Sequence, residues 1–195
     1  AGGTLTAALA GAPAIATPFP IGNALADQLK FVARMISTAA TTSTRRQVFF
    51  VSIGGFDTHD GLAQIHPGLL TTVAGAMNAF YQSTVELGVA NQVTAFTASD
   101  FGRTLTADDG SDHGWGSMHF MLGGAVRGGR YYGTAPAVAN NGPDDVGQGR
   151  LLPSTSVDQY AATLGKWFGI ADSDLLTVLP NLSHWNASQR NLGFV

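Results

Sequence analysis

The sequence predicts an α/β fold in which a mostly parallel sheet is flanked by helices. Two apolar runs, residues 48–53 and 93–97, carry β-branched and aromatic side chains on both faces, which is typical of strands buried in a parallel sheet. Between them, apolar side chains recur at helical spacing from Pro67 to the stop at Gly88. Strand, helix and strand in this order form a βαβ unit, whose crossover is almost always right-handed.

The first part of the chain divides into an irregular segment and a helix. We expect residues 1–22 to be peripheral and irregular, because three prolines interrupt any periodic pattern. Asn23 is a suitable N-cap, and apolar side chains at helical spacing predict a helix from there to about residue 41. Residues 23–195 are then expected to form a single α/β domain.

The second half of the chain carries weaker signals for a strand and clear signals for a helix. A short strand is expected at residues 120–122. Ser156, followed three residues later by Gln159, forms a capping-box pattern that predicts the start of a third long helix. Gly169 is the expected end of that helix, and a short helical turn is expected at residues 175–179.

Composition excludes several classes of protein. Charged residues make up only 12% of the chain and the formal net charge is −3, which argues against a highly basic nucleic-acid binder. No apolar run reaches the roughly 20 residues that span a bilayer. With 0 Cys, any bound metal must be held by His and carboxylate side chains. The scarcity of charge also leaves the surface less protected against self-association.

The chain begins with Ala1 rather than Met, and the opening stretch has no positive charge before its apolar residues. It therefore lacks the charged start of a signal peptide. We expect either that a leader has been removed or that the chain is a piece of a longer protein.

Ligand-type side chains follow the ends of the predicted strands. The loops GGFDTHD, SDFGRT and GSDHGWG supply these side chains: Asp57, His59, Asp60, Asp100, Arg103, Asp112 and His113. Ligands of open parallel sheets bind beyond the carboxyl ends of the strands, so these loops are expected to converge. Carboxylates gathered there repel one another unless a cation lies among them. The sequence predicts a divalent metal held by Asp57, Asp100 and His113.

Structural roles for these residues remain open. Asp57 or Asp100, taken alone, could simply cap a turn. His66 and Asp112 are weaker candidates for metal ligands, and His66 could instead mark the entry to the helix that Pro67 opens. His119, at the start of the third strand, is expected to be packed in the core.

Arg103 also has two interpretations. Its guanidinium could grip the oxygens of a phosphate or sulfate, or it could neutralise Asp100 or Asp112. The scattered glycines form neither GxGxxG after a strand nor a P-loop, so the sequence gives little support to nucleotide binding.

The motifs GGFDTH, VTAFTASDFGRT, DHGWG, GRLLPSTSVDQYAATLGKWFG and LPNL occur in this order between about residues 25 and 182. In this pattern the chain resembles the bacterial family called domain of unknown function 1501. The resemblance implies export by the twin-arginine route, and hence a periplasmic or extracellular location. That family is similar to the alkaline phosphatase and sulfatase superfamily, which implies an alkaline-phosphatase-like fold and hydrolysis of phosphate or sulfate esters.

The resemblance also implies roles for single residues. Asp57, His59 and His113 match the ligands of one metal, with Zn as the first choice and Mn, Mg or Ca as alternatives. Asp100 matches a carboxylate of a second metal, but Phe101 stands where that superfamily has a His. The strand that would bring the nucleophilic Ser or Thr precedes the matched region, so the nucleophile is unknown. The chain looks like the carboxyl-terminal part of the family's domain, which implies either a processed fragment or one of two pieces with a companion amino-terminal chain.

Two functions from different classes follow. The first is a metal-dependent hydrolase of a small anionic phosphate or sulfate ester, in which Arg103 binds the anion. The second is a catalytically silent structural module of the cell exterior, with the same fold, that associates with copies of itself.

Overall fold

The computed structural model describes residues 2–105 and 109–195. These residues form two compact units. Unit 1 extends to Ala95 and includes Leu122–Ala125, and unit 2 combines Phe96–Met121 with Val126–Val195. No helix in the described ranges is both long and apolar enough to cross a membrane.

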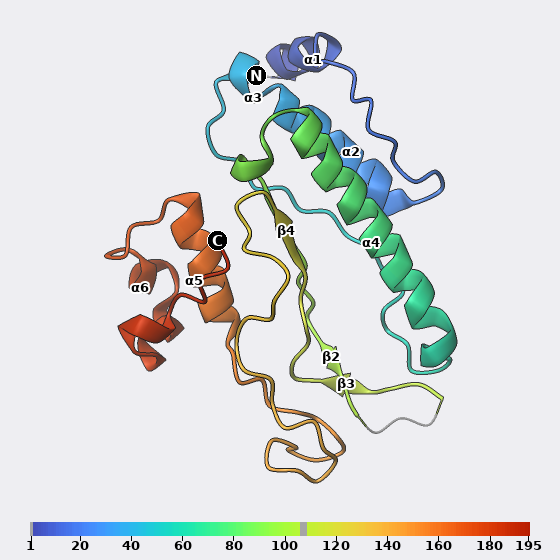
Figure 1. Cartoon of the computed structure of the whole chain (residues 1–195), viewed down its shortest axis with the longest axis vertical. Coiled ribbons are helices and arrows are strands. Elements are labelled where there is room, and N and C mark those ends of the chain that lie inside the picture. Colours follow the sequence, from blue (N-terminus) through green and yellow to red (C-terminus); the bar gives the residue numbers. More distant parts are fainter. Residues whose placement is uncertain (1, 106–108) are drawn as a thin grey trace. The chain divides into compact units, whose positions relative to one another are not determined.

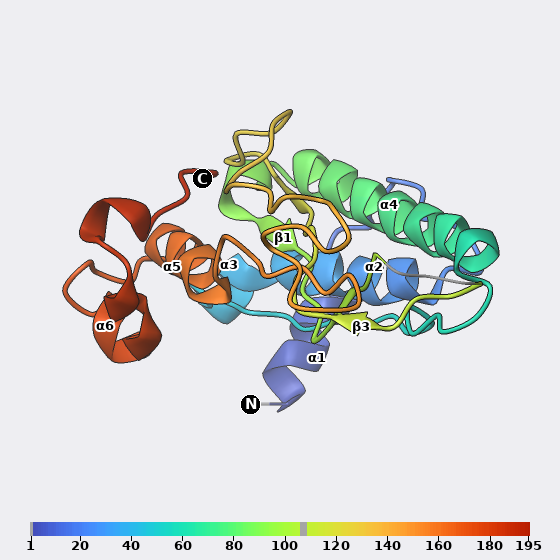
Figure 2. The same cartoon turned by 90° about the horizontal axis from the view of Figure 1, so that it is seen from below.

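Unit 1 is organised around two helices that pack side by side, α2 (Ala24–Ser37) and α4 (Leu62–Glu86) (Figures 1 and 2). Their facing sides bury an apolar cluster whose larger members are Leu25, Leu29, Val32, Val73 and Phe80. Fully burying one such side chain contributes about 1.5–3 kcal/mol, so this cluster is the main source of stability in unit 1.

The start of α2 confirms the prediction from Asn23. The Asn23 side chain accepts a hydrogen bond from the Ala26 N–H at 3.0 Å and donates one to the Thr72 carbonyl of α4 at 2.9 Å. One buried side chain therefore caps one helix and ties it to the next. The helix ends at Ser37, and a separate short helix, α3 (Ala39–Thr42), follows it.

The long helix α4 begins earlier than predicted, at Leu62 rather than Pro67. Gly61, in the left-handed conformation with φ 64°, precedes the first turn. Pro67 lies inside the helix, where its missing N–H removes one backbone hydrogen bond. The helix ends at Glu86, close to the predicted stop at Gly88.

The amino-terminal segment is only partly irregular. Residues Gly2–Ala10 form α1, where irregular chain was expected, because the first proline comes only at Pro13. The following irregular stretch is attached to α4 by the Glu86 carboxylate, which accepts hydrogen bonds from the Thr17 hydroxyl at 2.6 Å and from two backbone N–H groups. These bonds, above all that of Thr17, hold the pKa of Glu86 below its ordinary value.

Residues 47–53, called the edge segment below, are extended but belong to no sheet among the described residues. Their exposure alternates. Phe49, Val51 and Ile53 pack against the α2–α4 cluster, whereas Val48 is 79% exposed and Phe50 is 92% exposed. The prediction of a strand buried on both faces is therefore wrong, since only one face is covered.

The prediction of a mostly parallel sheet is also wrong. The chain is 41% helical, and its described strands form two small antiparallel sheets of two strands each. One sheet pairs β1 (Thr94–Phe96) with β4 (Met121–Gly123), and the other pairs β2 (Gly102–Arg103) with β3 (His113–Gly114). Within the described part of the chain, the edge segment lies on helices instead of pairing with β1, so no βαβ unit forms. The expected alkaline-phosphatase-like sheet is thus absent from the described ranges.

Unit 2 contains α5 (Val157–Phe168) and α6 (Leu175–Val178), as the sequence predicts. The capping box is present: the Ser156 hydroxyl accepts from the Gln159 N–H at 3.1 Å, and the Gln159 side chain accepts from the Ser156 N–H at 3.0 Å. Gly169, with φ 106°, ends α5. Short 3₁₀ turns occur at Ala90–Gln92 in unit 1 and at Pro180–His184 and Ala187–Gln189 in unit 2. A small core forms from Ala162, Leu175 and Leu182.

Candidate metal centre

Asp57 and His59 form an exposed pair in the loop between the edge segment and α4. The Asp57 Oδ1 and the His59 Nε2 lie 2.9 Å apart, and the side chains are 57% and 50% exposed. Thr58 between them is buried, so the alternation of an extended chain turns both flanking side chains toward solvent. Gly55 shapes the start of this loop, because its φ of 93° is one that few other residues adopt.

His113 lies in the small hairpin of unit 2, where it is the partner of Arg103 in the β2–β3 register. Its ring stacks on Phe101, with ring centroids 4.2 Å apart and planes 4° apart. Stacking covers the face of the imidazole, whereas a metal binds a ring nitrogen at the edge, in the ring plane. The stack therefore fixes the orientation of His113 and still allows it to act as a ligand.

The hairpin that carries His113 depends on a close approach of two backbones. A Cβ atom added at Gly102 would lie 1.8 Å from the carbonyl oxygen of Gly116. Only glycine fits there, so the sequences FGRT around β2 and HGWG from β3 to Gly116 permit a hairpin too tight for larger residues.

Asp57 and His59, whose side chains lie 2.9 Å apart in unit 1, offer a carboxylate oxygen and an imidazole nitrogen as possible metal ligands, and His113 in unit 2 offers a second imidazole. The donor set fits such an ion, because one carboxylate and two imidazoles with a further position open is the ligand set of several zinc enzymes. Ligand types that hold a divalent metal are present among the described residues, and the sharing of one ion by these residues stays a prediction. His59, named both from the loop GGFDTHD and from the resemblance, is one of the possible ligands.

The other predicted ligands do not belong to this set. Asp100 is exposed and is not a member, so its role as a ligand stays a prediction. The Asp112 carboxylate accepts the His113 N–H at 2.8 Å and lies 3.3 Å from Arg150, both of which are structural interactions. His66 lies edge-on against the ring of Phe56, at 5.8 Å.

Arg103 has a structural role in the hairpin. Its guanidinium donates a hydrogen bond to the Ser111 carbonyl and lies over the Phe101 ring, 5.0 Å from the centroid. The anion-binding role stays a prediction, and the position of Arg103 beside His113 in the register is compatible with it.

A half-buried polar cluster in unit 2 surrounds His119, as expected for a packed histidine. The His119 Nδ1 lies 3.3 Å from the Thr97 hydroxyl, and the Tyr160 hydroxyl donates to the Thr97 carbonyl. Burial lowers the pKa of His119 and raises that of Tyr160 well above its ordinary value. No local sequence signal places Tyr160 in this cluster, because it lies 63 residues from Thr97 along the chain.

Comparison with known proteins assigns the chain to a family. The family model described as "Protein of unknown function (DUF1501)" matches residues 9–179. No curated protein matches the chain, and no solved structure does. Because the family model covers most of the sequence, the chain belongs to the DUF1501 family of proteins of unknown function.

Proposed function

We propose that this chain binds one divalent metal ion, with Zn²⁺ as the preferred ion, through Asp57, His59 and His113. The observation that carries the proposal is the exposed pair of the Asp57 Oδ1 and the His59 Nε2, 2.9 Å apart in unit 1, to which His113 of unit 2 would add a second imidazole. Neutral imidazole and carboxylate suit Zn²⁺ best among the ions considered, whereas Mg²⁺ and Ca²⁺ prefer oxygen ligands only.

The proposed reaction is hydrolysis of a small phosphate or sulfate ester. A bound metal of this kind supplies Lewis-acid polarisation of an ester oxygen. The exposure of Asp57 and His59 leaves a small substrate free to approach. Arg103, beside His113 in the hairpin register, would bind the anionic oxygens through its planar fork of N–H donors. The resemblance to exported proteins supports a periplasmic or extracellular location as part of this proposal.

Calorimetric titration of the metal-free chain with ZnCl₂ tests the binding step. We expect a single site, and each of Asp57→Asn, His59→Gln and His113→Gln should weaken it by about tenfold or more, since loss of a supporting contact alone typically costs 10–100-fold. His184→Gln is the matched control, because His184 is an exposed histidine outside the set. Absence of binding, or equal weakening by the control, would overturn the proposal.

Turnover of nitrophenyl phosphate and nitrophenyl sulfate tests the reaction. We expect hydrolysis of at least one of them, dependent on added Zn²⁺, abolished in Asp57→Asn and retained in His184→Gln. A chain that binds Zn²⁺ at the three residues but hydrolyses neither ester would refute the hydrolase assignment and leave the metal site standing.

A further inference from the structure

The edge segment has the alternation of a β-strand but lacks a strand partner among the described residues. Its inner side chains, Phe49, Val51 and Ile53, cover α2 and α4, and its outer side chains Val48 and Phe50 are apolar and exposed. A run of this length without charge or proline, and rich in β-branched and aromatic residues, has a strong tendency to pair with another strand.

The backbone of this segment is open along one edge. In an extended chain, Val48, Phe50 and Ser52 direct their N–H and C=O groups to the same side. At Ser52 these groups are bonded by the Gln28 side-chain amide, which donates to the Ser52 carbonyl at 2.9 Å and accepts from the Ser52 N–H at 3.1 Å. One glutamine amide thus takes the place of one peptide group of a neighbouring strand. Within the described ranges, Val48 and Phe50 have no hydrogen bond in this direction.

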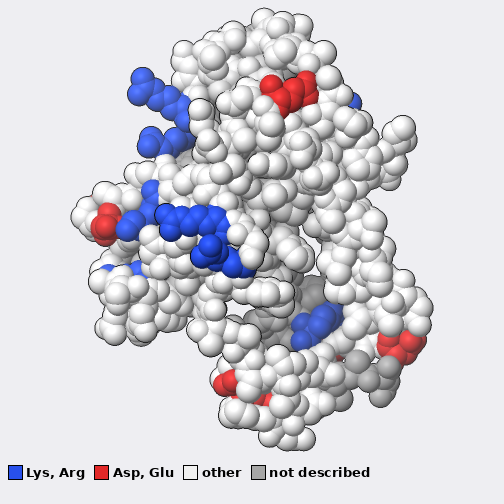
Figure 3. Space-filling model, viewed as in Figure 1, with Lys and Arg blue, Asp and Glu red and all other residues white. Residues whose placement is uncertain are grey.

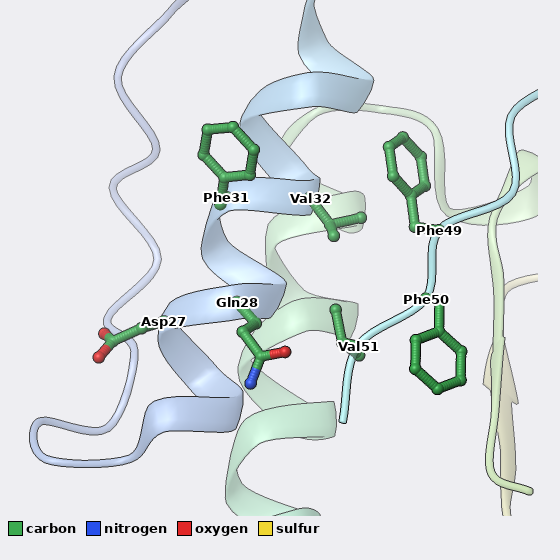
Figure 4. A pocket seen from close by; sticks show the side chains of 7 residues that line it. All are labelled: Asp27, Gln28, Phe31, Val32, Phe49, Phe50 and Val51. Carbon is green, nitrogen blue, oxygen red and sulfur yellow. The ribbon is translucent and has the colours of Figure 1, made fainter. Parts of the chain in front are cut away.

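A shallow apolar groove lies beside this edge. It has a volume of about 520 Å³, and its lining residues are Asp27, Gln28, Phe31 and Val32 of α2 with Phe49, Phe50 and Val51 of the edge segment. Figure 4 shows the groove between α2 and the edge segment, with Phe50 on the side of the segment away from α2. Phe31 is 53% exposed, so a strand added at this edge would cover apolar surface as well as backbone.

We propose that a second copy of this chain adds its own edge segment to this edge as an antiparallel strand. The charges flanking the segment select this occupant. Arg45 and Arg46 precede it, and Asp57 and Asp60 follow it. Antiparallel pairing of two copies brings the basic end of each beside the acidic end of the other, an arrangement that favours association. Charged residues make up only 12% of the chain, and the face shown in Figure 3 is mostly uncharged.

The pairing that centres on Val51 sets Phe50 of one copy opposite Ser52 of the other. In this register the two residues exchange a pair of backbone hydrogen bonds along the open edge. The Gln28 amide must then release Ser52. The inference uses the backbone, the apolar side chains and the flanking charges of the segment, and Asp57 is the one residue that it shares with the metal proposal.

Sedimentation velocity over a wide range of protein concentration tests the proposal, with chelator present so that metal bridging does not contribute. We expect a monomer–dimer equilibrium, weakened by about tenfold or more in Phe50→Lys, because a charge on an edge strand opposes pairing. The matched control is Val85→Lys, since Val85 is 48% exposed on α4 and lies outside the groove. It should associate like the wild type.

Hydrogen exchange at single amides tests the pairing in the wild-type chain, so a folding defect in a variant cannot affect this result. In the wild-type chain, the Val48 and Phe50 amides should exchange more slowly as the concentration rises, while the Val85 amide stays unchanged. A monomer at every concentration, dimers that leave the Val48 and Phe50 amides unprotected, or equal weakening by Val85→Lys would each overturn the proposal.

Discussion

Replacing Gln28 by alanine should strengthen the self-association of this chain, although the change removes polar contacts. In the monomer, the Gln28 amide holds Ser52 through hydrogen bonds of 2.9 and 3.1 Å. Each exposed bond of this kind contributes about 0.5 kcal/mol, at the low end of the usual range. The proposed dimer breaks both bonds in both copies. Gln28→Ala removes these four bonds from the two monomers before they associate, so the dimer is favoured by about 2 kcal/mol, which corresponds to roughly 30-fold tighter association.

Sedimentation equilibrium of Gln28→Ala beside the wild type measures this change directly. Gln82→Ala is the control, because Gln82 is an exposed glutamine of α4 outside the groove of the edge segment. It should leave the dissociation constant unchanged. If Gln28→Ala associates as the wild type does, or more weakly, then Gln28 does not compete with a second strand and the proposed register is wrong.

Three further predictions concern stability and the support of the site. Asn23→Ala should destabilise unit 1 by about 2 kcal/mol, because it removes a helix cap and a hydrogen bond to α4. Ser156→Ala removes a helix cap alone and should destabilise unit 2 by only about 1 kcal/mol. Equal losses in urea denaturation would contradict this ranking. Burial lowers the pKa of His119 in the folded chain from 6.5, so the folded chain favours the neutral imidazole. The contribution of this neutral imidazole to the free energy of unfolding is complete above about pH 6.5, and it is lost as the pH falls toward the lowered pKa. Melting temperatures should fall less on acidification in His119→Gln, and an identical fall would refute the assignment. Gly102→Ala should weaken Zn²⁺ binding by distorting the hairpin, while Gly128→Ala, where a Cβ meets nothing within 4 Å, should bind as the wild type in the same calorimetric titration.

The helices could be predicted from the sequence because their signals are local. Asn23 and the pair Ser156 and Gln159 bond to backbone groups within three residues, so the pattern of residue types is sufficient to place the helix starts. The predicted start of the second helix at Pro67 was wrong, since proline is also tolerated inside a helix when packing outweighs the lost hydrogen bond.

The sheet could not be predicted because strand pairing is not local. The apolar residues on both faces of the edge segment indicate a buried strand, but burial of its outer face requires a partner whose identity the segment itself does not specify. The tight β2–β3 hairpin depends on glycines whose importance appears only when the two backbones are brought together.

The candidate site was predicted in part. The loop motifs identified Asp57, His59 and His113 as ligand-type residues, and the resemblance implied that these three share one metal. Asp100 was favoured over His59 because it follows the second predicted strand, and the parallel sheet that would bring Asp100 to the same edge does not form within the described ranges.

The most direct test of the metal site is to count the imidazoles on a single bound ion. Cu²⁺, used as a spectroscopic substitute for Zn²⁺ at one equivalent, reports each coordinated histidine through electron spin echo modulation. The account predicts two imidazoles in the wild type and in His184→Gln, and one in His59→Gln and in His113→Gln. A wild-type signal from fewer than two imidazoles, or a signal that His113→Gln leaves unchanged, would contradict it.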